Sequence, residues 1–510
     1  MLRRRLLIIV SPVIFVITGS AASAADFQAQ VRRYRATHEA HIVGELVELT
    51  RLPSVAAEPG RLTQTAERLQ RLLADRGFES RLLSGEAGPP LVFGSLRTPG
   101  ARRTVVFYAH YDGQPVTPSQ WKNDPFTPVM RSGPLNSGEH EVDWKSSAPP
   151  FDPQWRLFAR AASDDKASIV AFLAAFDALR AAGRKPTVNI KVAWEGEEER
   201  GSPHLANTLR GNLDLFASDL WLIGDAPVHQ SRRQMIYFGA RGTLGFEATL
   251  YGPIRPLHDG HYGNWVPNPA AMAANLIAQL RDDDGTVLIP GLAAAARPLE
   301  PAELSAIAAL PPVEDSLRDE FAIGRSEGHE GLTASLMRPA LNIRGIRSGQ
   351  VGPDAANAIP TDAVVSVDLR LVPDQTPALA REKIEEFLRG KGWTILTEEP
   401  DLATRRTHSR LIRLEWEAGY PALRSDMSSA AAKAVLAAAG SASNEPVAVM
   451  PMMGGSVPLY LFADTFRVPV IGLPIVNHDN NQHAANENLR LQNLWDGIQT
   501  YAAMLADLTW

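Results

Sequence analysis

Three apolar, strand-like runs in this chain each end at an acidic or imidazole side chain. The runs are residues 105–109 ending at His110, residues 188–194 ending at the acidic stretch 195–199, and residues 220–224 ending at Asp225. Near-continuous apolar runs are typical of strands in a parallel sheet that is covered on both faces. Such strands would bring the charged groups to one edge of a buried sheet, where an unpaired charge is costly. A pair of divalent metal ions would supply the missing partners.

The composition limits the kinds of metal site and partner that the chain can have. The 510 residues include no cysteine, so disulfides and thiolate zinc sites are excluded, and His and carboxylates remain as ligands. The formal net charge is −6, whereas nucleic-acid binding proteins present a basic surface. We therefore expect no nucleic-acid partner.

The first 25 residues have the pattern of a secretory signal peptide. Three arginines at positions 3–5 precede an apolar run over 6–18, and the small residues 22–24 offer a cleavage site. An uncleaved membrane anchor is the alternative, but Pro12 interrupts the run, which is shorter than the ~20 residues that a span needs. We expect export, with a bacterial periplasm as the destination, and no stable membrane span after cleavage.

The order of strand-like and helical segments predicts two folded units, one inserted into the other. Strands and helices alternate over residues 26–238 and again over 411–510, which predicts an α/β catalytic domain with a mainly parallel sheet. Residues 239–410 follow a β-α-β-β-α-β order instead, which predicts a ferredoxin-like α+β domain. Two segments rich in Pro, Gly or Ala, 123–154 and 288–312, are expected to be excursions from these units.

Histidines and acids in this combination suit a hydrolytic metal site. Zn²⁺ accepts imidazole nitrogen and carboxylate oxygen, and a second metal requires a carboxylate that can bridge both. Asp112 lies two residues after His110 and could fix its tautomer. Glu198 and Glu199 are adjacent and cannot easily do the same job, so one could bind metal while the other acts as a general base.

Several segments resemble, in order, those of the co-catalytic dizinc peptidases. This family includes carnosinase-type dipeptidases, glutamate carboxypeptidases, aminoacylases and succinyl-diaminopimelate desuccinylases. The matching segments are 109–115 (AHYDGQP), 163–166 (SDDK), 195–202 (EGEEERGS), Asp225, 454–458 (GGSVP) and 482–487 (QHAANE). The resemblance covers nearly all of the chain after the signal segment, and it implies a metal-dependent hydrolase.

The resemblance implies a role for each candidate metal-site residue. Asp164 would bridge two metals, with His110 and Asp225 completing one site and Glu199 and His483 the other. Glu198 would be the catalytic base, and Asp112 would support the ligand His110. The metals would be Zn²⁺, with Co²⁺ or Mn²⁺ as alternatives. The peptide bond between Asp164 and Asp165 would be cis.

The resemblance also assigns residues of the inserted domain and of the glycine segment to the substrate. His258 resembles the lid histidine that reaches a partner subunit's active site and stabilises the oxyanion, which implies a lid and dimerisation role for this domain and a homodimer. Arg370 would bind the substrate carboxylate bidentately. Asn357, Gly455 and Ser456 would also contact substrate.

Single residues allow simpler interpretations. His110 alone could be a hydrogen-bonded core histidine, the acidic stretch 195–199 a solvated turn, and Asp164 a helix cap. Glu197 and His478 lie near the stronger candidates, and the register of the motifs favours Glu198, Glu199 and His483 over them. Only the joint pattern predicts the metal site.

The function predicted from the sequence is an exported hydrolase of small peptide or amide bonds, of the dipeptidase or carboxypeptidase type. A deacylase of N-acyl amino acids is the alternative, because it uses the same metals. A non-catalytic periplasmic binding protein is a third possibility. Met452 stands where dipeptidase relatives often have an arginine, so a carnosinase-like substrate preference does not carry over.

Overall fold

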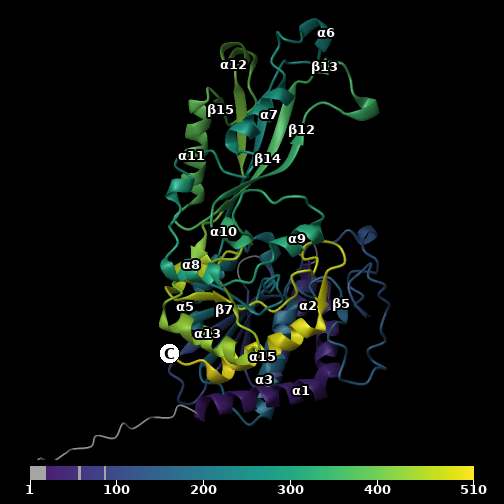
Figure 1. Ribbon diagram of the computed structural model, residues 1–510, viewed down its shortest axis with the longest axis vertical. Helices are drawn as coiled ribbons and strands as arrows, with labels where there is room; N and C mark the ends of the chain where they lie inside the picture. Colours follow the sequence, from purple (N-terminus) through teal and green to yellow (C-terminus); the bar gives the residue numbers. More distant parts are fainter. Residues whose placement is uncertain (1–18, 56–58, 85–87) are drawn as a thin grey trace, which may run out of the picture.

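The computed structural model describes residues 19–55, 59–84 and 88–510. The predicted signal segment lies outside the described residues as far as residue 18, and helix α1 (Gly19–Thr50) begins within its last part. No helix in the described part of the chain has the length and apolar character that crossing a membrane requires. The chain forms a large α/β unit and a second unit that projects from it (Figure 1).

The large unit is built on an eight-stranded sheet with the order β1-β2-β6-β3-β7-β19-β8-β18. Its strands are β1 (Glu79–Leu83), β2 (Leu91–Leu96), β3 (Thr104–His110), β6 (Asn189–Glu195), β7 (Leu220–Ile223), β8 (Met235–Tyr237), β18 (Ala448–Met450) and β19 (Val470–Gly472). The central strands β6, β3, β7 and β19 are parallel to their neighbours in that group.

The sheet as a whole is mixed, so the predicted mainly parallel character is confirmed only in part. β1 pairs antiparallel with β2, β2 with β6, and β19 with β8. The connection from β1 to β2 spans only residues 84–90, and a parallel pair needs a longer crossover. The apolar runs that end in charged residues belong to the parallel centre, and the edge strand β18 is also parallel to β8.

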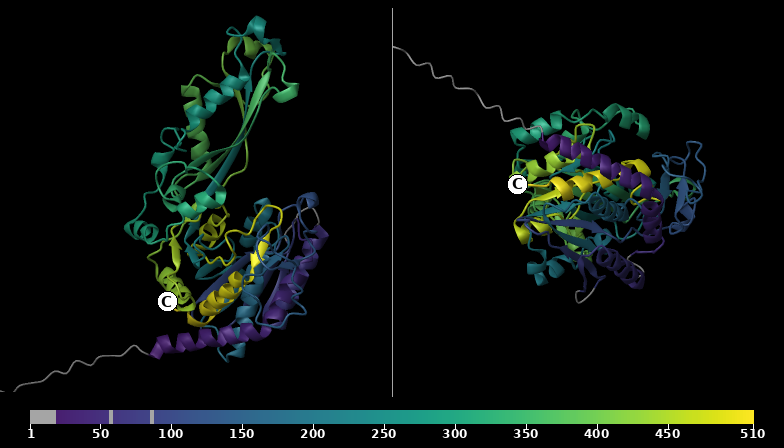
Figure 2. Two further views of the ribbon diagram at one scale, coloured as in Figure 1. Left: turned by 45° about the vertical axis from the view of Figure 1, so that its right-hand side comes forward. Right: turned by 90° about the horizontal axis from the view of Figure 1, so that it is seen from below.

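Helices cover both faces of this sheet. One face packs against α1, α2 (Pro59–Asp75), α3 (Lys166–Ala181), α13 (Ala430–Ala442) and α15 (Leu491–Asp507). The other packs against α4 (Leu205–Gly211), α5 (Leu213–Phe216) and α14 (Tyr460–Phe466). Along β3, Val105 and Phe107 face the first cluster and Val106 and Tyr108 the second, which is the alternation that a strand imposes. Seen from below, α1 and α15 lie side by side (Figure 2).

The second unit is a five-stranded sheet with the order β12-β14-β10-β16-β15. Its strands are β10 (Gly242–Tyr251), β12 (Ala340–Arg347), β14 (Asp362–Leu371), β15 (Thr394–Leu396) and β16 (Leu411–Trp416). Helices α7 (Pro269–Leu280) and α11 (Pro377–Gly390) share an apolar core with this sheet. The chain order β10-α7-β12-β14-α11-β15 is the one predicted from the sequence.

One strand of the second unit lies beyond the predicted boundary at residue 410. β16 pairs antiparallel with β10 and parallel with β15, so it is inserted between two strands of the predicted β-α-β-β-α-β arrangement. Its apolar residues Leu411, Ile412 and Leu414 are buried. The second sheet therefore ends at Trp416, and the chain returns to the large unit after it.

A bridging segment, residues 281–339, connects the two units. It contains α8 (Pro301–Ala308), α9 (Glu314–Phe321) and α10 (Leu332–Leu336), which lie between the two sheets (Figure 1). A buried ion pair of 2.7 Å between Glu303 and Arg424 joins α8 to β17 (Leu423–Arg424). The predicted excursion 288–312 is thus part of a segment that reaches the large unit.

The other predicted excursion, 123–154, packs beside a loop of the large unit. β4 (Val129–Arg131) and β5 (Arg156–Phe158) flank most of it, and β5 pairs with β20 (Asn488–Arg490). Just before it, the backbone N–H of Lys122 donates to Oδ1 of Asn486 at 2.8 Å. This part of the chain therefore supports the 477–487 loop, which contains the predicted ligand His483.

Candidate metal centre

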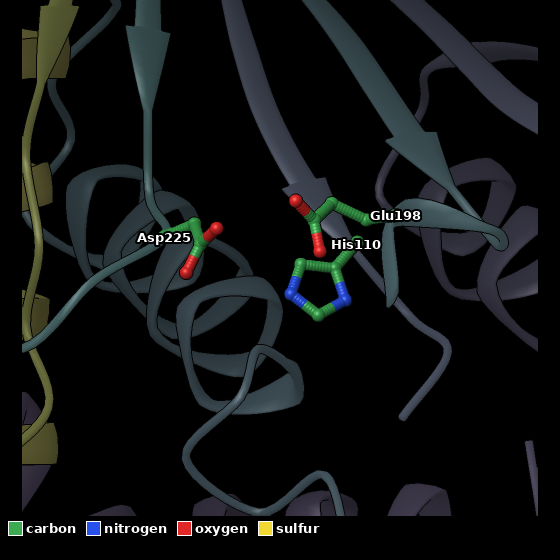
Figure 3. A group of neighbouring side chains, drawn as sticks. All are labelled: His110, Glu198 and Asp225. Carbon is green, nitrogen blue, oxygen red and sulfur yellow. The ribbon is translucent and has the colours of Figure 1, made fainter. Parts of the chain in front are cut away.

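The structure gathers the five predicted metal ligands and the predicted base Glu198 into two neighbouring groups. The first group is His110, Glu198 and Asp225, and the second is Asp164, Glu199 and His483. Within each group the possible ligand atoms lie within 4.8 Å of one another. Figure 3 shows the side chains of the first group pointing toward a common space. Strands β3, β6 and β7 supply His110, the acidic turn and Asp225, so the prediction of a shared sheet edge is correct in the geometry.

Asp164 lies between the two histidines. Its Oδ1 is 3.1 Å from Nε2 of His110, and its Oδ2 is 3.1 Å from Nε2 of His483. Nε2 of His483 is also 3.3 Å from Oε2 of Glu199. One carboxylate that presents a separate oxygen to each group has the arrangement of a ligand that bridges two cations. The peptide bond between Asp164 and Asp165 is cis, as the family resemblance implies.

The buried acids of these groups fit cations electrostatically. Burial, together with the charge of Asp164, raises the pKa of Glu199 to about 8 and that of Asp225 to about 6. Burial also raises the pKa of Glu198 well above its usual value. Oδ2 of Asp164 is buried and has no hydrogen bond of suitable geometry, although His483 is close to it. Bound cations would favour the ionised carboxylates and occupy this unused acceptor.

Asp112 connects His110 to the acidic turn. Its Oδ1 lies 3.3 Å from Nδ1 of His110, on the side of the ring that faces away from Asp164. The two oxygens of Asp112 also accept the backbone N–H groups of Glu198 and Glu199, at 3.2 and 3.1 Å. The side chain is therefore placed to orient the imidazole and to fix the start of the acidic turn.

The local sequence explains how the acidic turn is formed. Glu198–Arg200 is a single 3₁₀ turn that ends at Gly201, whose φ of 79° lies in the left-handed region that favours glycine. At Gly196 a Cβ atom would lie 2.3 Å from the ring of Tyr111, so only glycine fits before the turn. The two adjacent glutamates then diverge, with Glu198 toward Asp225 and Glu199 toward His483.

The position of Glu198 suits two roles. It lines the cavity at the metal centre, as a general base must. It also falls in the same group as His110 and Asp225, where the family resemblance implies Asp164 as the third ligand. The metal content of a Glu198 variant would distinguish a general base from a metal ligand.

Glu487 is a buried residue that lies in a matching segment of the sequence but has no predicted role. Its Oε1 accepts the backbone N–H groups of Ser163 at 2.9 Å and Asp164 at 3.0 Å, together with the Ser163 hydroxyl at 2.9 Å. Its Oε2 accepts the backbone N–H of Ala161 at 3.0 Å and Nη1 of Arg160 at 2.8 Å. Since Glu487 follows His483 by four residues, it joins the loop of His483 to the loop of Asp164.

A cavity of about 570 Å³ opens beside the metal centre. Arg370, at the end of β14, reaches it together with the glycine segment 454–456. Nη1 of Arg370 donates to Oγ of Ser456 at 2.7 Å, and its Nε donates to Asp368 at 2.8 Å. The structure therefore brings the predicted substrate residues Arg370, Gly455 and Ser456 to the cavity.

His258 and Asn357 do not reach the cavity of their own chain. β11 (Leu257–His258) pairs with β13 (Ala358–Ile359), next to α6 (Asp259–Tyr262), at the end of the second unit farthest from the large sheet (Figure 1). The carbonyl of Asn357 accepts the backbone N–H of Asp259 at 3.2 Å. The His258 side chain is 59% exposed. The two predicted residues are thus neighbours at a site remote from the metal centre.

Two side chains of the bridging segment line the cavity, and sequence reasoning missed them. Leu332 and Leu336 of α10 face it together with Met450 and Met453. Helix α10 has only five residues and follows a stretch without clear periodicity, so no pattern in the sequence places it. These contacts become evident only in the structure, where the bridging segment packs against the large unit.

Two imidazoles and four carboxylates that gather beside a cavity form a donor set suited to a metal-dependent hydrolase. The chain belongs to Peptidase family M20/M25/M40, because the sequence model of that family matches residues 106–507. Both the family and the class of enzyme are confirmed predictions.

Three known proteins show how far the similarity extends. The Cys-Gly metallodipeptidase dug1 of Schizosaccharomyces pombe is 25% identical over 438 residues, covering 82% of this chain and 83% of that protein. The human Beta-Ala-His dipeptidase is 24% identical over 505 residues, covering 94% and 92%. The M20 metallo-carboxypeptidase Sso-CP2 of Sulfolobus solfataricus has a structure that matches with a TM-score of 0.74 and 25% identity, covering 92% of this chain and 99% of that chain.

Proposed function

We propose that this chain is a dizinc peptidase that cleaves small peptides at a bond near a free carboxylate, as a dipeptidase or a carboxypeptidase. The observation that carries the proposal is Asp164, which faces His110 with one oxygen and His483 with the other, each at 3.1 Å. His110 and Asp225 would hold one metal and Glu199 and His483 the second. Bound Zn²⁺, or alternatively Co²⁺ or Mn²⁺, would supply Lewis acidity and lower the pKa of water.

Glu198 moves the proton in this proposal. Its carboxylate lines the cavity and lies beside His110 and Asp225, so it can take a proton from water held at the centre. The same carboxyl group then returns the proton to the leaving amine. Asp112 keeps Nε2 of His110 directed at Asp164 throughout.

Arg370 selects the substrate by its carboxylate. Its Nη1 bonds Ser456 and its Nε bonds Asp368, which holds the guanidinium plane at the cavity with donors to spare. Gly455 lies beside Ser456, and its lack of a side chain lets a substrate approach the backbone. The names of the dug1 protein and of the human relative, which both denote dipeptidases, support a dipeptide substrate.

Deacylation of N-acyl amino acids is the second candidate, and one observation favours it. The carboxylates among the described residues that line the cavity are Asp164, Glu198 and Asp225, all of which belong to the metal centre. A dipeptide brings an ammonium group that needs a negative partner, whereas a neutral acyl group does not. A carboxylate from a second subunit would remove this preference.

A panel of dipeptides and N-acyl amino acids separates the two candidates. We expect hydrolysis of dipeptides that is abolished by a chelator and restored by Zn²⁺. Hydrolysis of N-acyl amino acids alone would transfer the proposal to the deacylase. Activity that resists chelation would refute the metal site in both.

The proposed enzyme is a homodimer in which the second unit serves as a lid. His258 and Asn357 lie together, exposed, at the far end of that unit, where they could enter the cavity of a partner. The same end exposes Trp265 (80%) and Val351 (86%), as expected of a surface that meets another subunit.

We also propose that the protein is exported to a periplasm. The basic positions 3–5, the apolar run 6–18 and the small residues 22–24 support this. N-terminal sequencing of protein from the periplasmic fraction should give a start near Ala25. Protein that stays in the cytoplasm with Met1 retained would contradict it.

A further inference from the structure

The cavity has one wall that the proposed chemistry does not use. Apart from the metal centre and Arg370, most of its lining is apolar. The apolar residues of this wall are Val228, Met235, Leu332, Leu336, Met450, Met453 and Val457. Met235, Met450, Met453 and Val457 belong to one buried apolar cluster of the large unit, so this part of the wall is fixed.

The rest of the wall comes from α10 of the bridging segment. Leu332 and Leu336 are four residues apart on one helix, so they lie on the same face. The backbone N–H of Leu332 donates to Oε1 of Glu314 at 2.9 Å, which fixes the start of α10. Leu336 packs against the cluster around Met452, whose side chain is fully buried.

Helix α10 touches the segment that holds the substrate carboxylate. A Cβ atom built at Gly454 would lie 3.0 Å from Cδ1 of Leu336, and one at Gly455 would lie 3.7 Å from Cε of Met453. Gly455 is followed by Ser456, which bonds Arg370. Arg370 is the proposed partner of the substrate carboxylate. The substrate residue that carries this carboxylate would therefore place its side chain within reach of Leu336 and Met453.

We propose that Leu332, Leu336 and Met453 form a specificity pocket for the residue that bears the free carboxylate, and that this residue has a large apolar side chain. The proposal rests on the proposed peptidase function. A charged or small side chain gains nothing from this wall, because a charge would lose water without a partner and a glycine would leave the space unfilled. The unbranched side chain of Met453 adapts to side chains of different shape.

The test compares dipeptides that differ only in the second residue. We expect kcat/KM for Ala-Leu, Ala-Met and Ala-Phe to exceed that for Ala-Gly and Ala-Asp by at least about tenfold, since a single methylene in an apolar pocket discriminates by ~10–200-fold. Leu336→Ala should lower kcat/KM for Ala-Leu by about tenfold or more, mainly through KM, and change that for Ala-Gly by less than about twofold.

Two further variants keep the test decisive. Leu336→Met conserves the volume and should retain the preference for Ala-Leu even if Leu336→Ala unfolds. Leu304→Ala is the matched control, because Leu304 lies on α8 of the same segment, is 53% exposed and lies outside the cavity lining. It should leave both substrates unaffected.

Three outcomes would overturn the pocket without touching the peptidase proposal. These are equal rates for Ala-Leu and Ala-Gly, equal losses on both in Leu336→Ala, or a preference that follows the first residue of the dipeptide. By contrast, failure to cleave any dipeptide would refute the proposed function itself.

Discussion

Glu487 accepts the backbone N–H of Asp164 at 3.0 Å, although the two residues are 323 positions apart in the sequence. The bond joins the loop of the proposed bridging ligand to the loop of His483. Five donors converge on this one carboxylate, and one of them is the Arg160 guanidinium. The geometry of the second group of ligands therefore depends on a residue that belongs to neither group.

Glu487→Gln should weaken both the fold and the hold on metal. The amide offers one oxygen where two accept hydrogen bonds, and it leaves Arg160 buried without its charge partner. Removing one partner of a buried pair costs about 3–5 kcal/mol, so we expect a fall in the free energy of unfolding of that order. We also expect metal to be lost at lower chelator concentration, measured by metal analysis after dialysis. Glu445→Gln, at a surface glutamate that is 66% exposed, is the matched control. An unchanged metal content in Glu487→Gln would show that the bonds serve only the fold.

Glu198→Gln should abolish turnover and retain both metals. A general base contributes about 10²–10⁴-fold, so kcat should fall by that factor. The side chains of Glu198 and Glu199 are adjacent in sequence, which makes Glu199→Gln the natural comparison: it should lose metal as well as activity. Metal analysis of the two purified variants decides the assignment. Loss of one metal from Glu198→Gln would make Glu198 a ligand beside His110 and Asp225.

The sequence predicts those parts of the site that depend on the order of strands and side chains along a short stretch of chain. His110, Glu198 and Asp225 each follow an apolar run, and neighbouring parallel strands bring their ends together, so their meeting is predictable. Contacts between segments that are distant in the sequence cannot be predicted in this way. The hydrogen bonds of Glu487 are made to backbone groups of another loop, and no residue pattern encodes such a partner.

The same distinction applies to the fold: the order of helices and strands along the chain is predictable, whereas the pairing of distant strands is not. The β-α-β-β-α-β order of the second unit follows from periodicity along the chain. The insertion of β16 between β10 and β15 and the antiparallel pairs of the large sheet depend on which strands meet, and many registers suit one apolar pattern. Likewise α10 has no signal of its own, because its two leucines matter only after the bridging segment reaches the cavity.

Metal removal should make the stability of the protein fall as pH rises. Burial raises the pKa of Asp225 to about 6 and of Glu199 to about 8, and the close contact with the Asp164 carboxylate raises that of His483 to about 9. At these three groups the folded metal-free protein binds more protons than the unfolded chain above about pH 4, so their contribution to the free energy of unfolding decreases as pH rises through these values.

The same link between proton binding and stability predicts a pH-dependent difference in Tm between the metal-loaded and the metal-free protein. Bound cations favour ionised carboxylates and neutral imidazoles, so the loaded protein does not need these protons. We therefore expect the gap in Tm between loaded and chelator-treated protein to widen from about pH 5.5 to about pH 8.5. Differential scanning calorimetry at matched ionic strength measures it. A gap that stays constant or narrows would contradict the assignment of these residues to a metal centre.

Arg370→Lys should raise KM for substrates with a free carboxylate. Lysine keeps the charge but cannot form the planar, bidentate contact, nor bond Ser456 and Asp368 as the guanidinium does. Losing charge-assisted hydrogen bonds worth about 1.5–3 kcal/mol corresponds to a KM increase of roughly 10–150-fold. Amidated dipeptides, which lack the carboxylate, supply the control, because the variant and the parent should treat them alike. A loss confined to kcat would place Arg370 in the chemistry rather than in substrate binding.

The dimer proposal makes a prediction that no single variant can test. His258 lies remote from the cavity of its own chain, so the proposal assigns it to the cavity of its partner. His258→Ala and Glu198→Gln should each be nearly inactive alone. In a mixed dimer, one site combines both defects, whereas the other receives an intact Glu198 from one chain and an intact His258 from the other.

Co-refolding equal amounts of the two variants should therefore restore activity. Random pairing makes half of the dimers mixed, and each mixed dimer has one intact site of two, so about a quarter of the parent activity should return. Mixing without subunit exchange is the control and should restore none. If His258 instead acted within its own chain through a large movement of the second unit, co-refolding would leave the mixture inactive, because every chain would carry one of the two defects in its own site. Light scattering on the same samples verifies that the restored activity belongs to the dimer.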